Sequence, residues 1–166
     1  MNSEQLQAAI KTAKNAEALL MEATLLARYG RWARCYALAH LAREEVAKAQ
    51  LLRELPDDAN LQKAAQGMRD HRSKLAKSAE VFTMNEEESS DSRAVVEGAR
   101  QTSGVFNDLK NRSLYADFYD GGYWMPSEYI PVELAERTLK ITQFAVSRIQ
   151  GALECDMKEM RRRRDG

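Results

Sequence analysis

The sequence predicts an all-α protein: a single domain over residues 1–166, folded as an antiparallel bundle of four to five long helices. Apolar residues recur at steps of three and four over long stretches, which is the period of an amphipathic helix. Prolines number 3 and glycines 8, so few positions interrupt these stretches. Hydrophobic residues make up 44% of the chain, enough to bury a core without staples such as disulfides. We expect no strand and no internal repeat.

The first two helices follow from an apolar seam and from residues that start and stop helices. One begins at Ser3, a favoured N-cap residue, and ends at Gly30. The next runs from Arg31 to Leu55, where the turn sequence 56–58 ends it. The seam of the first helix consists of Leu6, Ala9, Ala13, Ala16, Leu20, Ala23 and Ala27.

The middle of the chain predicts two more helices and one loop. A third helix covers about residues 60–84, and a fourth extends to Phe118, with Leu114 and Phe118 as a core pair one turn apart. The segment 120–126 mixes glycines, a proline and aromatic residues, and is the most loop-like part of the chain.

The last helix is the clearest. It starts near Pro131, because proline suits a first helical position. It ends in Arg161–Arg164, whose positive charges favour the negative pole of the helix dipole. Its apolar stripe consists of Ala135, Leu139, Thr142, Val146, Ile149, Leu153 and Met160.

Charge and composition exclude several classes of protein. Lysine plus arginine and aspartate plus glutamate both number 25, so a surface for a polyanion must be a local patch. Cys35 and Cys155 match no metal-binding or redox spacing, which predicts reduced thiols in a cytoplasmic protein. No signal-like or membrane-spanning apolar run is found, so we expect no membrane contact. We expect no metal and no cofactor, because neither His40 nor His71 lies in a Glu-x-x-His pattern and phosphate-binding glycine loops are absent.

The second predicted helix carries a polar stripe. His40, Glu44 and Lys48 follow one another at intervals of one turn. One interpretation is an exposed ladder of side chains worth about 0.2–0.5 kcal/mol per pair. The other is a polar cleft between helices, in which Glu44 and Lys48 organise a site.

Two other segments are candidates for a functional surface. His71 and Lys74 share a face of a basic stretch that could contact phosphates or could be a solvated helix face. At the end of the fourth predicted helix, Arg112 and Tyr115 lie three residues apart, with Lys110 and Asp117 nearby. Arg112 could equally pair with an acidic residue of the bundle.

Three segments in order along the chain resemble the AbiV-type abortive infection proteins, a branch of the HEPN helical superfamily. Residues 30–48 are similar to a family helix that closes in Glu-Glu-Leu-Gly-Lys, with Val46-Ala47 in place of Leu-Gly. Residues 110–118 are similar to the family pattern Lys-x-Arg-x-Leu-Tyr-Val-Asp-Phe, and residues 70–74 resemble the histidine-containing block between them. Together these segments cover about a quarter of the chain.

The resemblance implies an HEPN-like fold, a homodimer, and a phage-defence toxin that arrests growth by acting on RNA or a ribosome-associated target. For the superfamily it also implies metal-independent RNA cleavage by an arginine and a histidine. Arg34 and His40 have the spacing of the superfamily motif, but Cys35 follows the arginine where a polar residue is usual. A chance match is about an even bet for so short a motif. We therefore do not assign the catalytic pair to Arg34 and His40.

The leading hypothesis assigns the chemistry to four residues. Arg112 and Lys110 hold a phosphate, His71 transfers protons, and Tyr115 is the fourth candidate catalytic residue. Four others support them or extend the binding surface: Glu44, Lys48, Lys74 and Asp117.

Two other hypotheses remain open. The chain could be a non-catalytic bundle that acts by occupying a protein or RNA partner. It could also be an antitoxin-like HEPN partner of a separate nucleotidyltransferase. A phage-encoded activator protein is a further expected partner.

Overall fold

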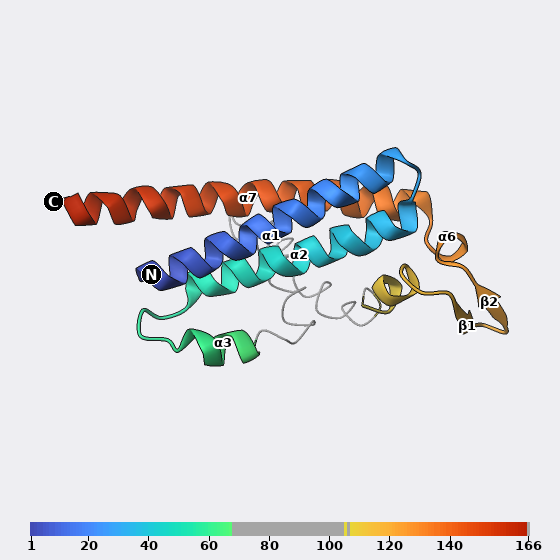
Figure 1. Cartoon of the computed structure of the whole chain (residues 1–166), viewed down its shortest axis with the longest axis horizontal. Coiled ribbons are helices and arrows are strands. Elements are labelled where there is room, and N and C mark those ends of the chain that lie inside the picture. Colours follow the sequence, from blue (N-terminus) through green and yellow to red (C-terminus); the bar gives the residue numbers. More distant parts are fainter. Residues whose placement is uncertain (68–104, 106, 166) are drawn as a thin grey trace, which may run out of the picture.

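A computed structural model describes residues 1–67, 105 and 107–165, and three long helices form the body of this part (Figure 1). They are α1 (Ser3–Arg28), α2 (Trp32–Glu54) and α7 (Val132–Asp165). α1 and α2 are antiparallel, and α7 lies alongside both and runs parallel to α2 (Figure 1). The prediction of an all-α fold is confirmed. No helix among the described residues has both the length and the apolar character needed to cross a bilayer.

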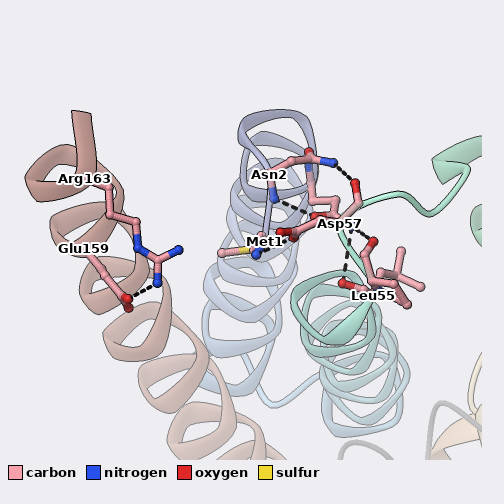
Figure 2. Close-up of polar contacts among 8 residues, drawn as sticks. Met1, Asn2, Leu55, Asp57, Glu159 and Arg163 are labelled. Atoms are coloured by element: carbon pink, nitrogen blue, oxygen red, sulfur yellow. Dashed lines mark hydrogen bonds and ion pairs between the residues drawn. The ribbon is translucent and has the colours of Figure 1, made fainter.

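The start of α1 is fixed to the end of α2 by polar contacts (Figure 2). The N-cap of α1 is Asn2, not Ser3, and its side chain accepts a hydrogen bond from the backbone N–H of Gln5 at 2.9 Å. The Asn2 amide donates to the carbonyl of Asp57 at 2.7 Å, and the Gln5 amide donates to that of Pro56 at 2.5 Å. These contacts satisfy backbone groups that a helix end would otherwise leave unpaired.

The predicted apolar seams form the core between the three helices. α2 lies against both α1 and α7, and its many alanines let the neighbouring helices approach closely. For this reason α2 is buried on most of its circumference. The main core cluster contains Leu6, Ala9, Ala13, Ala16, Val46, Ala49, Leu52, Ala145, Val146, Ile149 and Leu153.

The fourth predicted helix ends earlier than expected, and a β-hairpin follows it. The helical segment described at 107–112 gives way to β1 (Asp117–Tyr119) and β2 (Gly122–Trp124), which pair antiparallel. Asp120 and Gly121 form the two-residue connection with φ of 50° and 77°, the left-handed conformation that such hairpin turns require. The expectations of no strand and of a helix reaching Phe118 were therefore wrong.

The expected core pair, Leu114 and Phe118, is also not found. Leu114 lies in a turn at 36% exposure, and Phe118 lies in β1 at 68% exposure. A turn and an extended strand replace the helix here, so a spacing of four no longer places these two side chains one helical turn apart. After the hairpin, the short helix α6 (Pro126–Tyr129) leads into α7.

Two sequence predictions fall largely beyond the described part of the chain. The third predicted helix is described only at its start, as α3 (Leu61–Gly67). His71 and Lys74 lie outside the described residues.

Candidate functional site

A buried ion pair joins α2 to the helical segment 107–112. The ammonium group of Lys110 donates to Glu44 Oε1 at 3.1 Å, and both side chains are less than 10% exposed. Nε2 of His40, which is fully buried, lies 3.4 Å from the same oxygen. The hydroxyl of Ser113 donates to the carbonyl of Lys110 at 2.5 Å, which fixes the end of the segment. We call Glu44, Lys110 and His40 the buried polar cluster.

The surroundings set the charge state of this cluster. Burial alone would raise the pKa of Glu44, but its contacts with His40 and Lys110 hold that pKa well below the usual range. Burial lowers the pKa of His40, and this outweighs the opposing effect of Glu44. Near neutral pH the cluster therefore contains one anion, one cation and a neutral imidazole.

The predicted stripe on α2 divides between the interior and the surface. His40 and Glu44 are buried, so the interpretation of an exposed ladder does not hold for them. Lys48 is one-third exposed and pairs with Glu45 instead of Glu44. Arg34 is exposed whereas His40 is fully buried, so the two are not presented together.

Lys110 and Arg112 extend into different surroundings, although the sequence hypothesis placed both on one phosphate. Residues two apart on a helix are separated by about 200° around its axis. Lys110 accordingly extends into the bundle, whereas Nε of Arg112 lies 2.7 Å from Oδ2 of Asp108 near the surface. The sequence left open that Arg112 pairs with an acidic residue, and Asp108, one turn earlier on the same segment, is that residue.

Arg112 is held between aromatic rings. Its guanidinium carbon lies 3.3 Å from the centre of the Tyr119 ring and 4.6 Å from that of Tyr129. The two rings meet edge to face with their centres 5.6 Å apart. Arg112 thus joins the helical segment to both β1 and α6, through contacts that stabilise a cation on a ring face.

These residues line a hollow on the surface. We define the aromatic hollow as Arg112, Tyr115, Asp117, Tyr119, Trp124 and Tyr129. A groove of about 310 Å³ continues from it along Asp108, Asn111 and Phe118. Nη1 of Arg112 is buried and has no hydrogen-bond partner among the described residues. A buried donor of this kind is costly unless an acceptor reaches it.

The rim of the hollow is both aromatic and acidic. Tyr115 and Tyr123 are about 70% exposed, and Trp124 is 42% exposed. Two acidic residues, Asp108 and Asp117, are among the described residues that line the hollow and its groove, against the single cation Arg112. This surface can stack on flat or apolar groups, and its net charge is negative.

Of the predicted site residues, the hollow contains Arg112, Tyr115 and Asp117. Sequence reasoning missed Tyr119, Tyr129 and Asp108, which hold Arg112 in place. The Asp-Gly pair at the hairpin turn was an available signal, because it predicts that the flanking aromatic residues face one another across strands. Among the described residues 1–67, 105 and 107–165, no group of three or more His, Cys, Asp or Glu side chains could hold a metal ion.

Comparison with known proteins identifies the family. The family model HEPN_AbiV, described as AbiV, matches residues 4–146, which include the buried polar cluster and the aromatic hollow. Searches of curated proteins and of solved structures gave no significant match. The match covers most of the chain and agrees with the all-α fold. The chain therefore belongs to the AbiV family of HEPN proteins, which places it among the abortive infection proteins of phage defence.

Proposed function

We propose that this protein is a growth-arresting toxin of phage defence that acts on RNA or the translation machinery, and that it contacts its target through the aromatic hollow. The observation that carries this proposal is Nη1 of Arg112, a buried donor beside an open groove that has no hydrogen-bond partner in the described part of the chain. An acceptor oxygen of a phosphate or carboxylate would complete its hydrogen bonding. Tyr115, which is exposed at the rim, offers a ring for stacking and a hydroxyl.

Within this proposal the buried and exposed residues have different roles. Lys110 and Glu44 position the helical segment, because their pair is buried and cannot touch a large ligand. Arg112, Tyr115 and Asp117 touch the target. If RNA is cleaved, proton transfer needs another group, since the imidazole of His40 is buried. His71 is the only other histidine of the chain, and Lys74 would add positive charge beside it.

A second candidate function is non-catalytic inhibition by occupying a protein partner. The acidic rim favours it, because negative charges beside Arg112 repel a phosphate backbone but attract a basic protein surface. The exposed aromatic residues of the hairpin are of the type that anchors protein interfaces. We propose a phage-encoded activator as a partner of this kind. An antitoxin-like role beside a nucleotidyltransferase has no comparable observation in its favour.

We also propose that the protein is a cytoplasmic homodimer. A groove of about 620 Å³ lies between α1 and α7, with Leu20, Met21, Leu25 and Val146 among its lining residues. Met21 is 68% exposed, and Phe144 on α7 is about half exposed. A second copy would cover this apolar surface in a two-fold arrangement, the commonest solution for such surfaces.

Incubation of the pure protein with total RNA, with and without a chelator, tests the function. RNA cleavage that survives chelation and is lost in Arg112→Ala supports a metal-independent ribonuclease. Arg137→Ala is the matched control, because Arg137 is exposed on α7 and lines neither the hollow nor its groove. Absence of cleavage, together with capture of ribosomes or of a protein by the wild type, would favour the non-catalytic binding function over the ribonuclease.

A further inference from the structure

The last turns of α7 carry a basic surface that the proposed function does not use. Arg161, Arg162, Arg163 and Arg164 are all exposed, and we call them the arginine turn. Residues 158–165 contain five basic and two acidic side chains, in a chain whose total charge is zero. The arginine turn lies beyond residues 4–146, the part matched by the family model.

The helix geometry sets the arginine turn apart from the bundle. α7 extends past the ends of α1 and α2 (Figure 1). Met157 and Met160 still pack against the core, and Arg161 and Arg164 follow them by four residues on the same stripe. The face of α7 that is apolar along the bundle therefore becomes cationic where the helix projects. With Arg162 and Arg163 on the remaining faces, positive charge surrounds the helix.

Little of this charge is neutralised within the described structure. Arg163 pairs with Glu159 one turn earlier, along α7 and apart from the contacts between α1 and α2 (Figure 2). No described residue forms an ion pair with Arg161, Arg162 or Arg164. Like charges within one turn repel each other, and the helix dipole offsets this only in part. A bound polyanion would relieve the repulsion.

The surroundings favour a nucleic acid over a membrane as that polyanion. Helices that lie on a membrane insert large apolar side chains beside their basic residues. After Phe144, α7 exposes no large hydrophobic side chain, and its two methionines near the arginines face the core. A backbone of phosphates needs only charge and donors, and arginine provides both in a rigid fork.

We propose that the arginine turn binds the phosphate backbone of RNA without sequence preference. This contact is separate from the aromatic hollow, because the hairpin and the projecting end of α7 lie at opposite ends of the molecule (Figure 1). The inference rests on the proposed function only in the choice of RNA as the nucleic acid. The arginine turn would concentrate RNA near the protein, and the hollow would make the specific contact.

The test compares three full-length proteins by the fluorescence anisotropy of a short labelled single-stranded RNA. The first is the wild type, and the second carries Arg161→Gln, Arg162→Gln, Arg163→Gln and Arg164→Gln. The matched control removes four exposed positive charges elsewhere: Lys11→Gln, Lys14→Gln, Arg137→Gln and Lys140→Gln. Circular dichroism checks that each protein keeps its helix content, which glutamine favours about as well as arginine does.

We expect the arginine-turn variant to bind RNA at least about tenfold more weakly than the control variant at low salt. The slope of log K against log salt concentration, where K is the association constant for RNA, should also be less steep than that of the control variant by about 3, because each of four phosphate contacts contributes about 0.7 to the slope for single strands. Equal losses in both variants would overturn the inference, since binding would then follow net charge alone. Tighter binding of the wild type to phosphatidylglycerol vesicles than to RNA of equal phosphate concentration would also overturn it.

This test does not depend on growth arrest. Arg137→Ala, at an exposed position that belongs neither to the arginine turn nor to the lining of the hollow, should retain the anisotropy signal and the steep salt dependence of the wild type. If growth arrest requires Arg112 but the arginine-turn variant binds RNA as tightly as the control variant, only this inference is contradicted. A protein that shows the effect but does not need Arg112 for growth arrest contradicts the proposed function alone.

Discussion

Replacing Lys110 by methionine should destabilise the protein strongly. The change removes the ammonium group that lies 3.1 Å from the carboxylate of Glu44, which is 4% exposed, while the neutral imidazole of His40 stays close to that carboxylate. Removing one partner of a buried pair costs about 3–5 kcal/mol, because the remaining charge is desolvated without compensation. His40 still lies close to Glu44, so we expect the low end of this range, about 3 kcal/mol.

The double variant Glu44→Gln/Lys110→Met should be more stable than Lys110→Met alone. Glutamine keeps the shape of the side chain and removes the uncompensated charge, so most of the lost free energy of unfolding should return. Urea unfolding followed by circular dichroism measures both variants. Lys140→Met is the control, because Lys140 is exposed on α7 and should change stability by no more than about 0.5 kcal/mol.

The pH dependence of Lys110→Met gives an independent check. Lys110 contributes to the lowering of the pKa of His40, so its removal raises that pKa while Glu44 remains nearby. A protonated imidazole then replaces the lost cation at acidic pH, and the deficit of the variant should shrink as the pH falls below about 6.5. A deficit under about 0.5 kcal/mol at neutral pH, or a double variant no more stable than the single, would refute this reasoning.

Three further predictions follow from burial and exposure. The wild type should lose stability as the pH falls below about 6.5, because burial lowers the pKa of His40 and the unfolded chain then binds more protons than the folded one. Below about 4.5 the lowered pKa of Glu44 adds to this loss for the same reason. A free energy of unfolding that does not change with pH in denaturant unfolding would contradict both effects. A thiol reagent should label exposed Cys155 quickly and Cys35 only after unfolding, since burial raises the pKa of Cys35 to about 11; mass spectrometry that finds Cys35 labelled first in the folded protein would contradict this. Light scattering should give about twice 18.8 kDa for the wild type and 18.8 kDa for Met21→Lys, whereas a monomeric wild type at micromolar concentration would exclude the dimer.

The long helices could be predicted from sequence because their burial follows one face. The seam of α1 and the stripe of α7 have the period of a helix in contact on one side, and most of their residues are buried. α2 gives no such pattern, because it is covered from several sides. A charged residue such as Glu44 then looks like part of a solvated face until a cation from another segment is found beside it. The partner, Lys110, is 66 residues away, and no local pattern indicates the pairing.

The candidate site could be predicted only in part. Arg112 and Tyr115 were identified from their spacing and from the aromatic segment that follows. The separation of Lys110 from Arg112 was predictable, since positions two apart on a helix do not face each other. The contacts of Arg112 with Tyr119 and Tyr129 were not, because they depend on how the hairpin and α6 fold back onto the helical segment.

We expect Arg112 to act in function and to be dispensable for the bundle. The measurement is growth of cells after induction of the wild type, Arg112→Lys, Arg112→Ala and the control Arg137→Ala, with melting of each purified protein. Arg112→Ala should lose nearly all growth arrest and Arg112→Lys most of it, because lysine keeps the charge without the fork. Both should melt within a few degrees of the wild type, since Arg112 contacts the hairpin and α6 and not the main core. Tyr115→Phe should weaken the arrest with little change in melting. A folded Arg112→Ala protein that still arrests growth fully would contradict this role of Arg112 and would make the basic segment around His71 the next candidate.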